Sequence, residues 1–126
     1  ILDFLGGQTL PGGFLRPMEF EPTSNKWQGH ACRGFQLHVT DPDTFRPYQS
    51  SLRLLQAILR NHPDDFKWKQ PPYEYEYERL PIDLILGTDT VRISLQAMAS
   101  VSDLEAAWQA DLTAYDQMRR RYFLYT

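Results

Sequence analysis

The chain has 126 residues, of which 42% are apolar and 23% are charged, and its formal net charge is −3. This length predicts a single domain over residues 1–126, with the composition of an ordinary globular protein. The only clustered cations are Arg119, Arg120 and Arg121, so we do not expect the basic face of a nucleic-acid-binding protein. No apolar run approaches the ~20 residues that cross a bilayer, and a single cysteine excludes an internal disulfide.

Two strands are predicted in the first third of the chain. Residues 14–22 and 32–41 both alternate apolar and polar side chains with the period of two that is typical of a strand. The apolar side of the second strand consists of Phe35, Leu37 and Val39. We expect this side to lie in a core, and the polar loop between the strands would let them pair antiparallel.

A helix is predicted next. Asp43 or Thr44 is its expected N-cap, with Pro47 in the first turn, where the missing N–H costs little. Apolar side chains then recur at helical spacing up to Pro63, as a stripe that would face the core. The members of this stripe are Phe45, Tyr48, Leu52, Leu55 and Leu59.

The run "YEYEYE" alternates without interruption, which predicts a strand. In that strand Tyr73, Tyr75 and Tyr77 would pack inward and the glutamates between them would face water. An aromatic shelf for a sugar or a partner is the alternative interpretation, because tyrosine rings suit such surfaces.

The last third is predicted to be helical. Two short helices meet at Gly87, and Thr88 or Asp89 would cap the second of them. In the final helix Ser102 and Glu105 have the spacing of a capping box. Together, the elements predict an α+β fold, in which a small antiparallel or mixed sheet packs against three or four helices.

The end of the loop and the second strand suggest metal or thiol chemistry, because His30 precedes the strand and Cys32 and His38 lie within it. If residues 32–38 are extended, however, the Cα atoms of Cys32 and His38 lie ~20 Å apart. That separation excludes both a shared metal ion and a Cys–His pair for catalysis. His30 and Cys32 could still meet, but two residues do not make a metal motif, so no metal site is expected, and no cofactor is expected either. The carboxylates include no local pattern that marks a glycosidase pair.

The polar side of the second strand is the more informative feature. Cys32, Gly34, Gln36 and His38 share one side, and the missing side chain at Gly34 would let a ligand or another backbone approach closely. Trp27 lies in the polar loop without periodic apolar partners, which favours a contact role. The alternative is a strand face that is merely covered or solvated.

The same residues bring out a family resemblance. The text "RPMEFEPTSNKWQGHACRGFQLHVTDPDTFRP" resembles the C-terminal domain of the exo-β-N-acetylmuramidase family, long known as a domain of unknown function. The likeness continues in "HPDDFKW", "PIDLILGTDTVR" and "WQADLTAYDQMRRRYFLY", and so covers essentially the whole chain. One departure is Asn25, which separates Ser24 from Lys26 where the family text usually runs Ser-Lys.

The resemblance implies a function. Members of that family remove terminal N-acetylmuramic acid from the non-reducing ends of peptidoglycan fragments, in bacterial cell-wall recycling. They have a Rossmann-like N-terminal domain that carries the general acid/base carboxylate and meets the smaller C-terminal domain at the active-site cleft. The chain would then be the accessory half of a glycoside hydrolase, with no catalytic residue of its own and no activity alone.

The resemblance also implies site residues. Six positions match the family motif and would line the C-terminal wall of the cleft: Thr23, Ser24, Lys26, Cys32, Gln36 and His38. A lysine beside hydroxyls suits a lactyl carboxylate and sugar hydroxyls, which are positioning roles. The implied partners are the N-terminal domain and a muropeptide or another glycan containing N-acetylmuramic acid, in the periplasm or outside the cell. The alternative function is a non-catalytic domain that binds glycan or protein.

Overall fold

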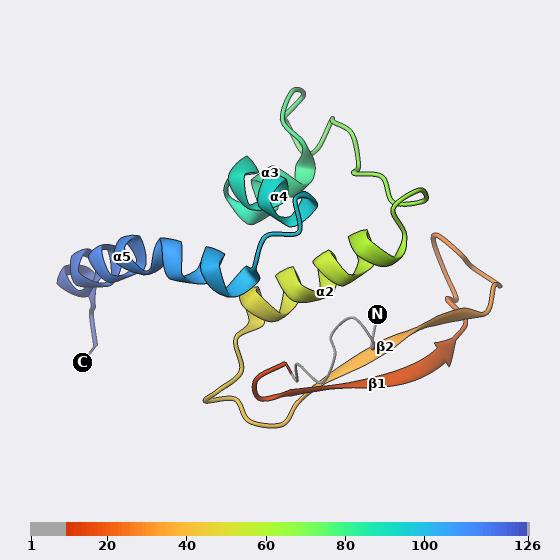
Figure 1. Cartoon of the computed structure of the whole chain (residues 1–126), viewed down its shortest axis with the longest axis horizontal. Helices are drawn as coiled ribbons and strands as arrows, with labels where there is room; N and C mark the ends of the chain where they lie inside the picture. Colours follow the sequence, from red (N-terminus) through yellow and green to blue (C-terminus); the bar gives the residue numbers. More distant parts are fainter. Residues whose placement is uncertain (1–9, 126) are drawn as a thin grey trace. The chain divides into compact units, whose positions relative to one another are not determined.

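The computed structural model describes residues 10–125, which divide into two compact units (Figure 1). One unit lies within residues 10–50 and contains a β-hairpin, and the other lies within residues 51–125 and is helical. The described residues thus combine a two-stranded antiparallel sheet with four α-helices and one 3₁₀ turn, which confirms the predicted α+β class. None of these helices is long and apolar enough to cross a membrane.

The hairpin pairs β1 (Gly13–Phe20) with β2 (Cys32–Val39) in a register that runs from Gly13 opposite Val39 to Phe20 opposite Cys32. Because opposite residues share a face, the apolar positions of β1 lie on the polar side of β2. Each face of the hairpin is therefore mixed. The expectation of one apolar face in a core was wrong, since Leu37 and Val39 are 40% and 48% exposed.

At the end of the hairpin opposite the loop, backbone hydrogen bonds to Gly12 hold the two strands together. Its carbonyl accepts hydrogen bonds from the N–H groups of Thr40 and Asp41, at 2.8 and 3.1 Å. A Cβ atom on Gly12 would lie 2.3 Å from the carbonyl oxygen of Asp41, and the φ angle of Gly12 is +68°. Only glycine fits this position without rearrangement.

The Asp41 side chain organises the turn that follows β2. Its carboxylate accepts hydrogen bonds from the N–H of Asp43, at 3.1 Å, and from the hydroxyl of Thr44, at 2.8 Å. The hydrogen bond from Thr44 is the main cause that lowers the pKa of Asp41. Asp43 and Thr44 therefore belong to a turn that precedes the next helix, and the prediction that one of them caps it was wrong.

That helix is α2 (Pro47–Asn61), which leads from the hairpin unit into the helical unit. It is followed by α3 (Pro81–Leu86), α4 (Asp89–Gln96), α5 (Val101–Arg119) and the 3₁₀ turn η1 (Arg120–Tyr122). The buried core of the helical unit consists of Leu52, Val91, Leu95 and Val101. It therefore joins α2, α4 and the beginning of α5. Of the stripe predicted for α2, Leu52 is buried in this core and Leu55 and Leu59 pack against it, whereas Tyr48 is 41% exposed.

The short helices are fixed by caps and by one ion pair. The Thr88 hydroxyl accepts the N–H of Thr90, so Thr88 rather than Asp89 caps α4. The guanidinium of Arg92 donates two hydrogen bonds to the Asp83 carboxylate, at 2.6 and 3.2 Å, and so ties α4 to α3. Both side chains are largely shielded, with exposed fractions of 18% and 11%.

The helix α5 begins two residues earlier than the capping box predicted. The Ser100 hydroxyl accepts the N–H of Asp103 at 3.3 Å, so Ser100 is the N-cap. Ser102 lies inside the first turn, where its hydroxyl accepts a hydrogen bond from Arg53 of α2. Beyond Trp108 the apolar side of α5 is exposed, and Tyr115, for example, is 58% exposed.

The "YEYEYE" segment is a tight turn, so the strand predicted there was wrong. The backbone N–H of Tyr73 donates to the carbonyl of Glu76, and the N–H of Glu76 donates to the carbonyl of Tyr73, both at 3.0 Å. Between them, Glu74 has a φ of +52°. The burial is also opposite to the prediction, because Tyr75 and Tyr77 are 93% and 71% exposed. The local hydrogen bonds of Glu76 favour the turn over the strand that the alternating pattern predicts.

Those hydrogen bonds come from the chain just beyond the turn. The carboxylate of Glu76 accepts the N–H groups of Glu78 and Arg79, at 2.9 and 3.2 Å, and the guanidinium Nε of Arg79 at 3.0 Å. These bonds, led by the one from Glu78, lower the pKa of Glu76 to about 2. A carboxylate that accepts several N–H groups is stabilised in its charged form, which is the state that holds this turn.

Candidate functional site

The loop between the strands carries three of the six residues expected in a site, namely Thr23, Ser24 and Lys26, and all three are exposed. Its shape is set by Asn25 and Gly29, which have φ angles of +64° and +74°. The Asn25 side chain accepts the N–H of Lys26 at 2.9 Å. The inserted Asn25 therefore takes a left-handed conformation that asparagine tolerates, and its amide fixes the backbone at Lys26.

Trp27 is the most unusual residue of the loop. Its φ is +64°, a left-handed conformation that costs a non-glycine residue ~1–2 kcal/mol. A hydrogen bond of 3.0 Å from the His30 N–H to the Trp27 carbonyl holds this backbone. The indole is 71% exposed and meets the His30 ring edge-on, with 6.3 Å between ring centroids. The loop therefore presents a large aromatic surface beside Lys26.

The other three expected residues, Cys32, Gln36 and His38, share one side of β2, as the alternation predicts. The Cys32 thiol donates a hydrogen bond to the His30 carbonyl, with a sulfur–oxygen distance of 3.6 Å, and is half-buried. Gln36 and His38 are exposed. This side can therefore offer amide and imidazole groups to a ligand.

The register adds a residue that the sequence did not single out. Arg16 of β1 lies opposite Gln36, and its Nη2 donates a hydrogen bond of 2.7 Å to the Gln36 Oε1. The guanidinium thus lies on the same side as Gln36 and His38 and orients the Gln36 amide. The polar position of Arg16 between Phe14 and Met18 was the available signal, but only the register shows which side of β2 it joins.

The gap at Gly34 is filled from within the hairpin. A Cβ atom on Gly34 would lie 3.2 Å from Cε1 of the Phe20 ring. Phe20 stands opposite Cys32, on the same side as Gly34, so its ring covers the space that the missing side chain leaves. The expectation that Gly34 admits a ligand or another backbone was wrong, because the glycine accommodates Phe20.

These positions form an extended surface and not a closed pocket. His38 lies six positions after Cys32 along an unbroken strand, which places their Cα atoms ~20 Å apart. One small ligand cannot contact both ends, whereas a chain-like ligand or a facing domain can. Within residues 10–125, no three His, Cys, Asp or Glu side chains gather closely enough to hold a metal ion.

We name Arg16, Gln36 and His38, which share one side of the strands, together with the exposed Lys26 of the loop that joins the strands, the polar row of the hairpin. It combines the ammonium group of Lys26 and the guanidinium group of Arg16 with the amide of Gln36 and the imidazole of His38. Groups of this kind bind carboxylates and sugar hydroxyls, and they lack the paired carboxylates by which glycosidases cleave a glycosidic bond. The row is therefore suited to holding an anionic or hydroxyl-rich ligand.

Comparison with known proteins identifies relatives of the whole chain. A family model described as "Exo-beta-N-acetylmuramidase NamZ, C-terminal" matches residues 1–125. The peptidoglycan beta-N-acetylmuramidase NamZ of Bacillus subtilis is 28% identical over 116 residues, which cover 92% of this chain and 26% of that protein. A crystal structure of a DUF1343 family protein from Bacteroides fragilis matches with a TM-score of 0.73 at 20% identity, over 98% of this chain and 32% of the other. The chain thus spans between a quarter and a third of the length of these relatives.

Proposed function

The chain belongs to the family of C-terminal domains of exo-β-N-acetylmuramidases, and from this premise we propose that it forms one wall of the substrate cleft of such an enzyme. The enzyme would release terminal N-acetylmuramic acid from peptidoglycan fragments, and this domain would hold the substrate. The polar row of the hairpin is the observation that carries the proposal. It is exposed, it includes Lys26 and Arg16, and its chemistry matches a sugar that bears a carboxylate.

The proposed division of labour follows from the chemistry of the row. Glycoside hydrolysis needs a carboxylic acid and a second carboxylate across the scissile bond. The row offers cations and neutral donors, which position a substrate and contribute binding energy. We therefore assign the general acid/base carboxylate to the N-terminal domain, a Rossmann-like domain, and leave orientation of the lactyl carboxylate and hydroxyls to Lys26, Arg16 and Gln36.

A partner domain also accounts for the exposed apolar side chains. On the hairpin, Phe14 is 57% exposed and Val39 is 48% exposed, and these residues lie on opposite faces. On α5, Leu112 and Tyr115 are 51% and 58% exposed. Apolar surface of this extent marks interaction sites in soluble proteins. In the proposed enzyme, the N-terminal domain would cover part of it. The location would be the periplasm or the cell exterior, where peptidoglycan lies.

The test uses a two-domain protein that carries this chain as its C-terminal domain, assayed with a chromogenic β-muramide. Lys26→Ala and Arg16→Ala are each expected to lower kcat/KM by about tenfold or more, because each removes a charged hydrogen bond to the substrate. Arg33→Ala is the matched control. Arg33 is also a hairpin arginine but lies on the opposite face, where it pairs with Glu19.

The isolated chain is expected to leave the muramide intact. Hydrolysis by the isolated chain would refute the accessory role. Equal kinetics for the Lys26, Arg16 and Arg33 variants would remove the polar row from the site while leaving the family assignment in place.

A further inference from the structure

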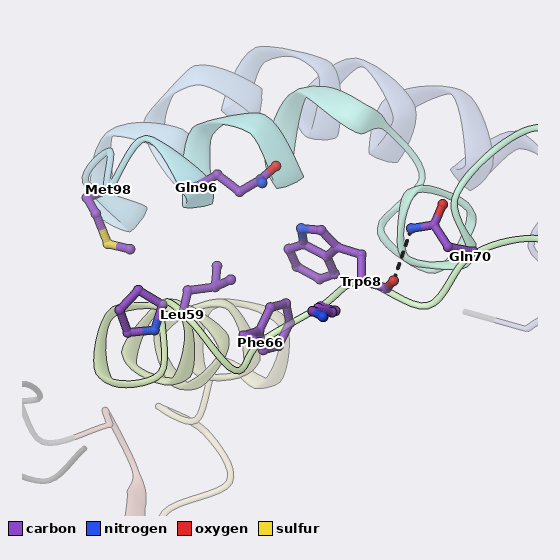
Figure 2. A pocket seen from close by; sticks show the side chains of 8 residues that line it. Leu59, Phe66, Trp68, Gln70, Gln96 and Met98 are labelled. Carbon is purple, nitrogen blue, oxygen red and sulfur yellow. Dashed lines mark hydrogen bonds between the residues drawn. The ribbon is translucent and has the colours of Figure 1, made fainter.

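Figure 2 shows a hollow in the helical unit, and no residue of the polar row of the hairpin lines it. It has a volume of about 590 Å³, within the range of roughly 300–1,000 Å³ that small-molecule sites occupy. It lies between the end of α2, the segment that follows α2 and the end of α4. Its lining consists of Leu59, Pro63, Phe66, Lys67, Trp68, Gln70, Gln96 and Met98.

One part of the lining is apolar. The rings of Phe66 and Trp68 meet edge-to-face, with 4.8 Å between centroids and an interplanar angle of 83°. Figure 2 shows Leu59 beside Phe66 on one side of the hollow and Met98 on the other side. Leu59 also packs against the buried core, so this wall is supported from behind. Such a wall suits the methyl groups or the ring face of a small ligand.

The other part of the lining consists of hydrogen-bond donors. The indole Nε1 of Trp68 is buried and has no hydrogen-bond partner among the described residues. A buried donor without an acceptor costs free energy, which a ligand that supplies the acceptor would recover. The lining also includes one cation, Lys67, and contains no aspartate or glutamate.

Gln96 adds a donor whose orientation is fixed. Its Oε1 accepts a hydrogen bond of 3.1 Å from Arg92, which is itself held by Asp83. With the oxygen used in this way, the amide nitrogen of Gln96 is the group that remains to donate. On the other side, Gln70 Nε2 donates to the Trp68 carbonyl at 3.1 Å and steadies the segment that carries the indole.

We propose that this hollow binds a small ligand with a carboxylate next to an apolar or acetamido group. The carboxylate would accept hydrogen bonds from the Trp68 indole, the Gln96 amide and the Lys67 ammonium, while the apolar part lies on the Phe66–Trp68 pair. Carboxylates favour such charge-assisted bonds, and the lining contains no acidic side chain to repel one. Two sources offer this chemistry, an acidic amino sugar and the carboxyl end of a short peptide.

The experiment follows the indole N–H resonances of the ¹⁵N-labelled chain by NMR. The chain has three tryptophans, so Trp→Phe variants at positions 27, 68 and 108 assign the three signals. N-acetylmuramic acid is the sugar probe and alanylalanine is the peptide probe. N-acetylglucosamine is the matched control, because it lacks the lactyl carboxylate. We expect a saturable shift of the Trp68 indole signal with at least one carboxylate probe and none with N-acetylglucosamine.

Variants then test the assigned contacts. Lys67→Met keeps the apolar stem of the lysine and is expected to raise Kd about tenfold or more, as is Gln96→Leu. Lys69→Met is the control, since Lys69 lies over the Tyr73 ring and does not line the hollow. Binding of only one of the two probes identifies the source of the carboxylate. An equal response to N-acetylglucosamine, no saturable shift at Trp68, or an unchanged Kd in Lys67→Met would overturn the proposal.

This inference is independent of the proposed function. A saturable shift confined to the Trp27 indole would support the hairpin as a sugar contact and contradict the hollow. Loss of activity in the Lys26 variant, with no binding at Trp68, would support the hairpin alone. The two sites therefore succeed or fail separately.

Discussion

Different interactions stabilise the hairpin unit and the helical unit. In the helical unit, Leu52 and Leu95 are completely buried and form a side-chain core. In the hairpin, Phe14 and Leu37 are 57% and 40% exposed, and the structure rests on the strand ladder and on the turns at its ends. The residues proposed to hold substrate lie on the unit that buries few of its own side chains, as expected of a surface that another body covers.

The same contrast appears in the ion pairs of the two units. Arg92 and Asp83 join two helices and are 18% and 11% exposed, whereas Arg33 and Glu19 cross the hairpin strands at 86% and 66% exposure. Water and salt screen the exposed pair, so it contributes little to stability. The helical unit thus depends on buried side-chain contacts, whereas the ion pair of the hairpin is exposed, and substitutions should separate the two.

The largest effect is expected in the helical core. Leu95→Ala removes a side chain that is 0% exposed, and we expect a loss of ~2–5 kcal/mol in the free energy of unfolding. Ile93→Ala in the same helix is the control, because Ile93 is 52% exposed and its truncation should cost much less. Urea unfolding followed by circular dichroism at 222 nm measures both. Equal losses would mean that Leu95 is not in a core.

The second effect is expected in the backbone of the hairpin. Gly12→Ala would place a Cβ atom 2.3 Å from the Asp41 carbonyl, in a left-handed conformation. We expect a loss of ~2–4 kcal/mol from this combination of overpacking and backbone strain. Gly29→Ala is the matched control. Gly29 has a φ of +74° but no atom within 4 Å of the added carbon, so we expect its substitution to lower the free energy of unfolding by only ~1–2 kcal/mol.

Amide hydrogen exchange measured by NMR locates the damage. In Gly12→Ala the amides of β1 and β2 should lose protection while those of α4 keep theirs, because each unit has its own stabilising contacts. Loss of protection in both units together would contradict the independence of the hairpin.

The sequence predicted the elements better than their contacts. Both strands, the helix after them, the two short helices around Gly87 and the final helix are present, because period and caps are local signals. The register of the hairpin depends on both strands at once, so neither pattern alone could show that Phe14 shares a side with His38. The roles of Arg16 and of Phe20 against Gly34 follow from that register and were missed for the same reason.

Two of the local errors have a common physical cause. In "YEYEYE" the alternation suggested a strand, but the hydrogen bonds of Glu76 to residues 78 and 79 favour a turn. At α5, Ser102 and Glu105 matched a capping box, yet Ser100 caps the helix. In both places a polar side chain bonds to nearby backbone N–H groups, and several positions in the sequence offer such a bond. The periodicity of apolar residues does not show which of these positions makes the bond.

The third prediction compares the two ion pairs directly. Asp83→Asn leaves the half-buried Arg92 without its charged partner, and we expect a loss of ~1–3 kcal/mol, less than for a fully buried pair. Glu19→Gln in the exposed hairpin pair should cost ~0–1 kcal/mol. Urea unfolding at low and high salt measures both. A larger loss for Glu19→Gln would reverse the distinction between the two units.

The smallest effect is expected at Glu76, which lies in the helical unit but outside its core. The pKa of this carboxyl is lowered from 4.5 to about 2, chiefly by the hydrogen bond from the Glu78 N–H. Because the folded pKa lies below the unfolded value, the charged carboxylate stabilises the turn fully above pH 4.5, and this contribution is lost as the pH falls from 4.5 towards 2. The amide shifts of Glu78 and Arg79 should therefore titrate near pH 2, and Glu76→Gln should abolish that titration. A midpoint near 4.5 would show that the turn in solution lacks these hydrogen bonds, and the alternating tyrosines would again be free to form a strand.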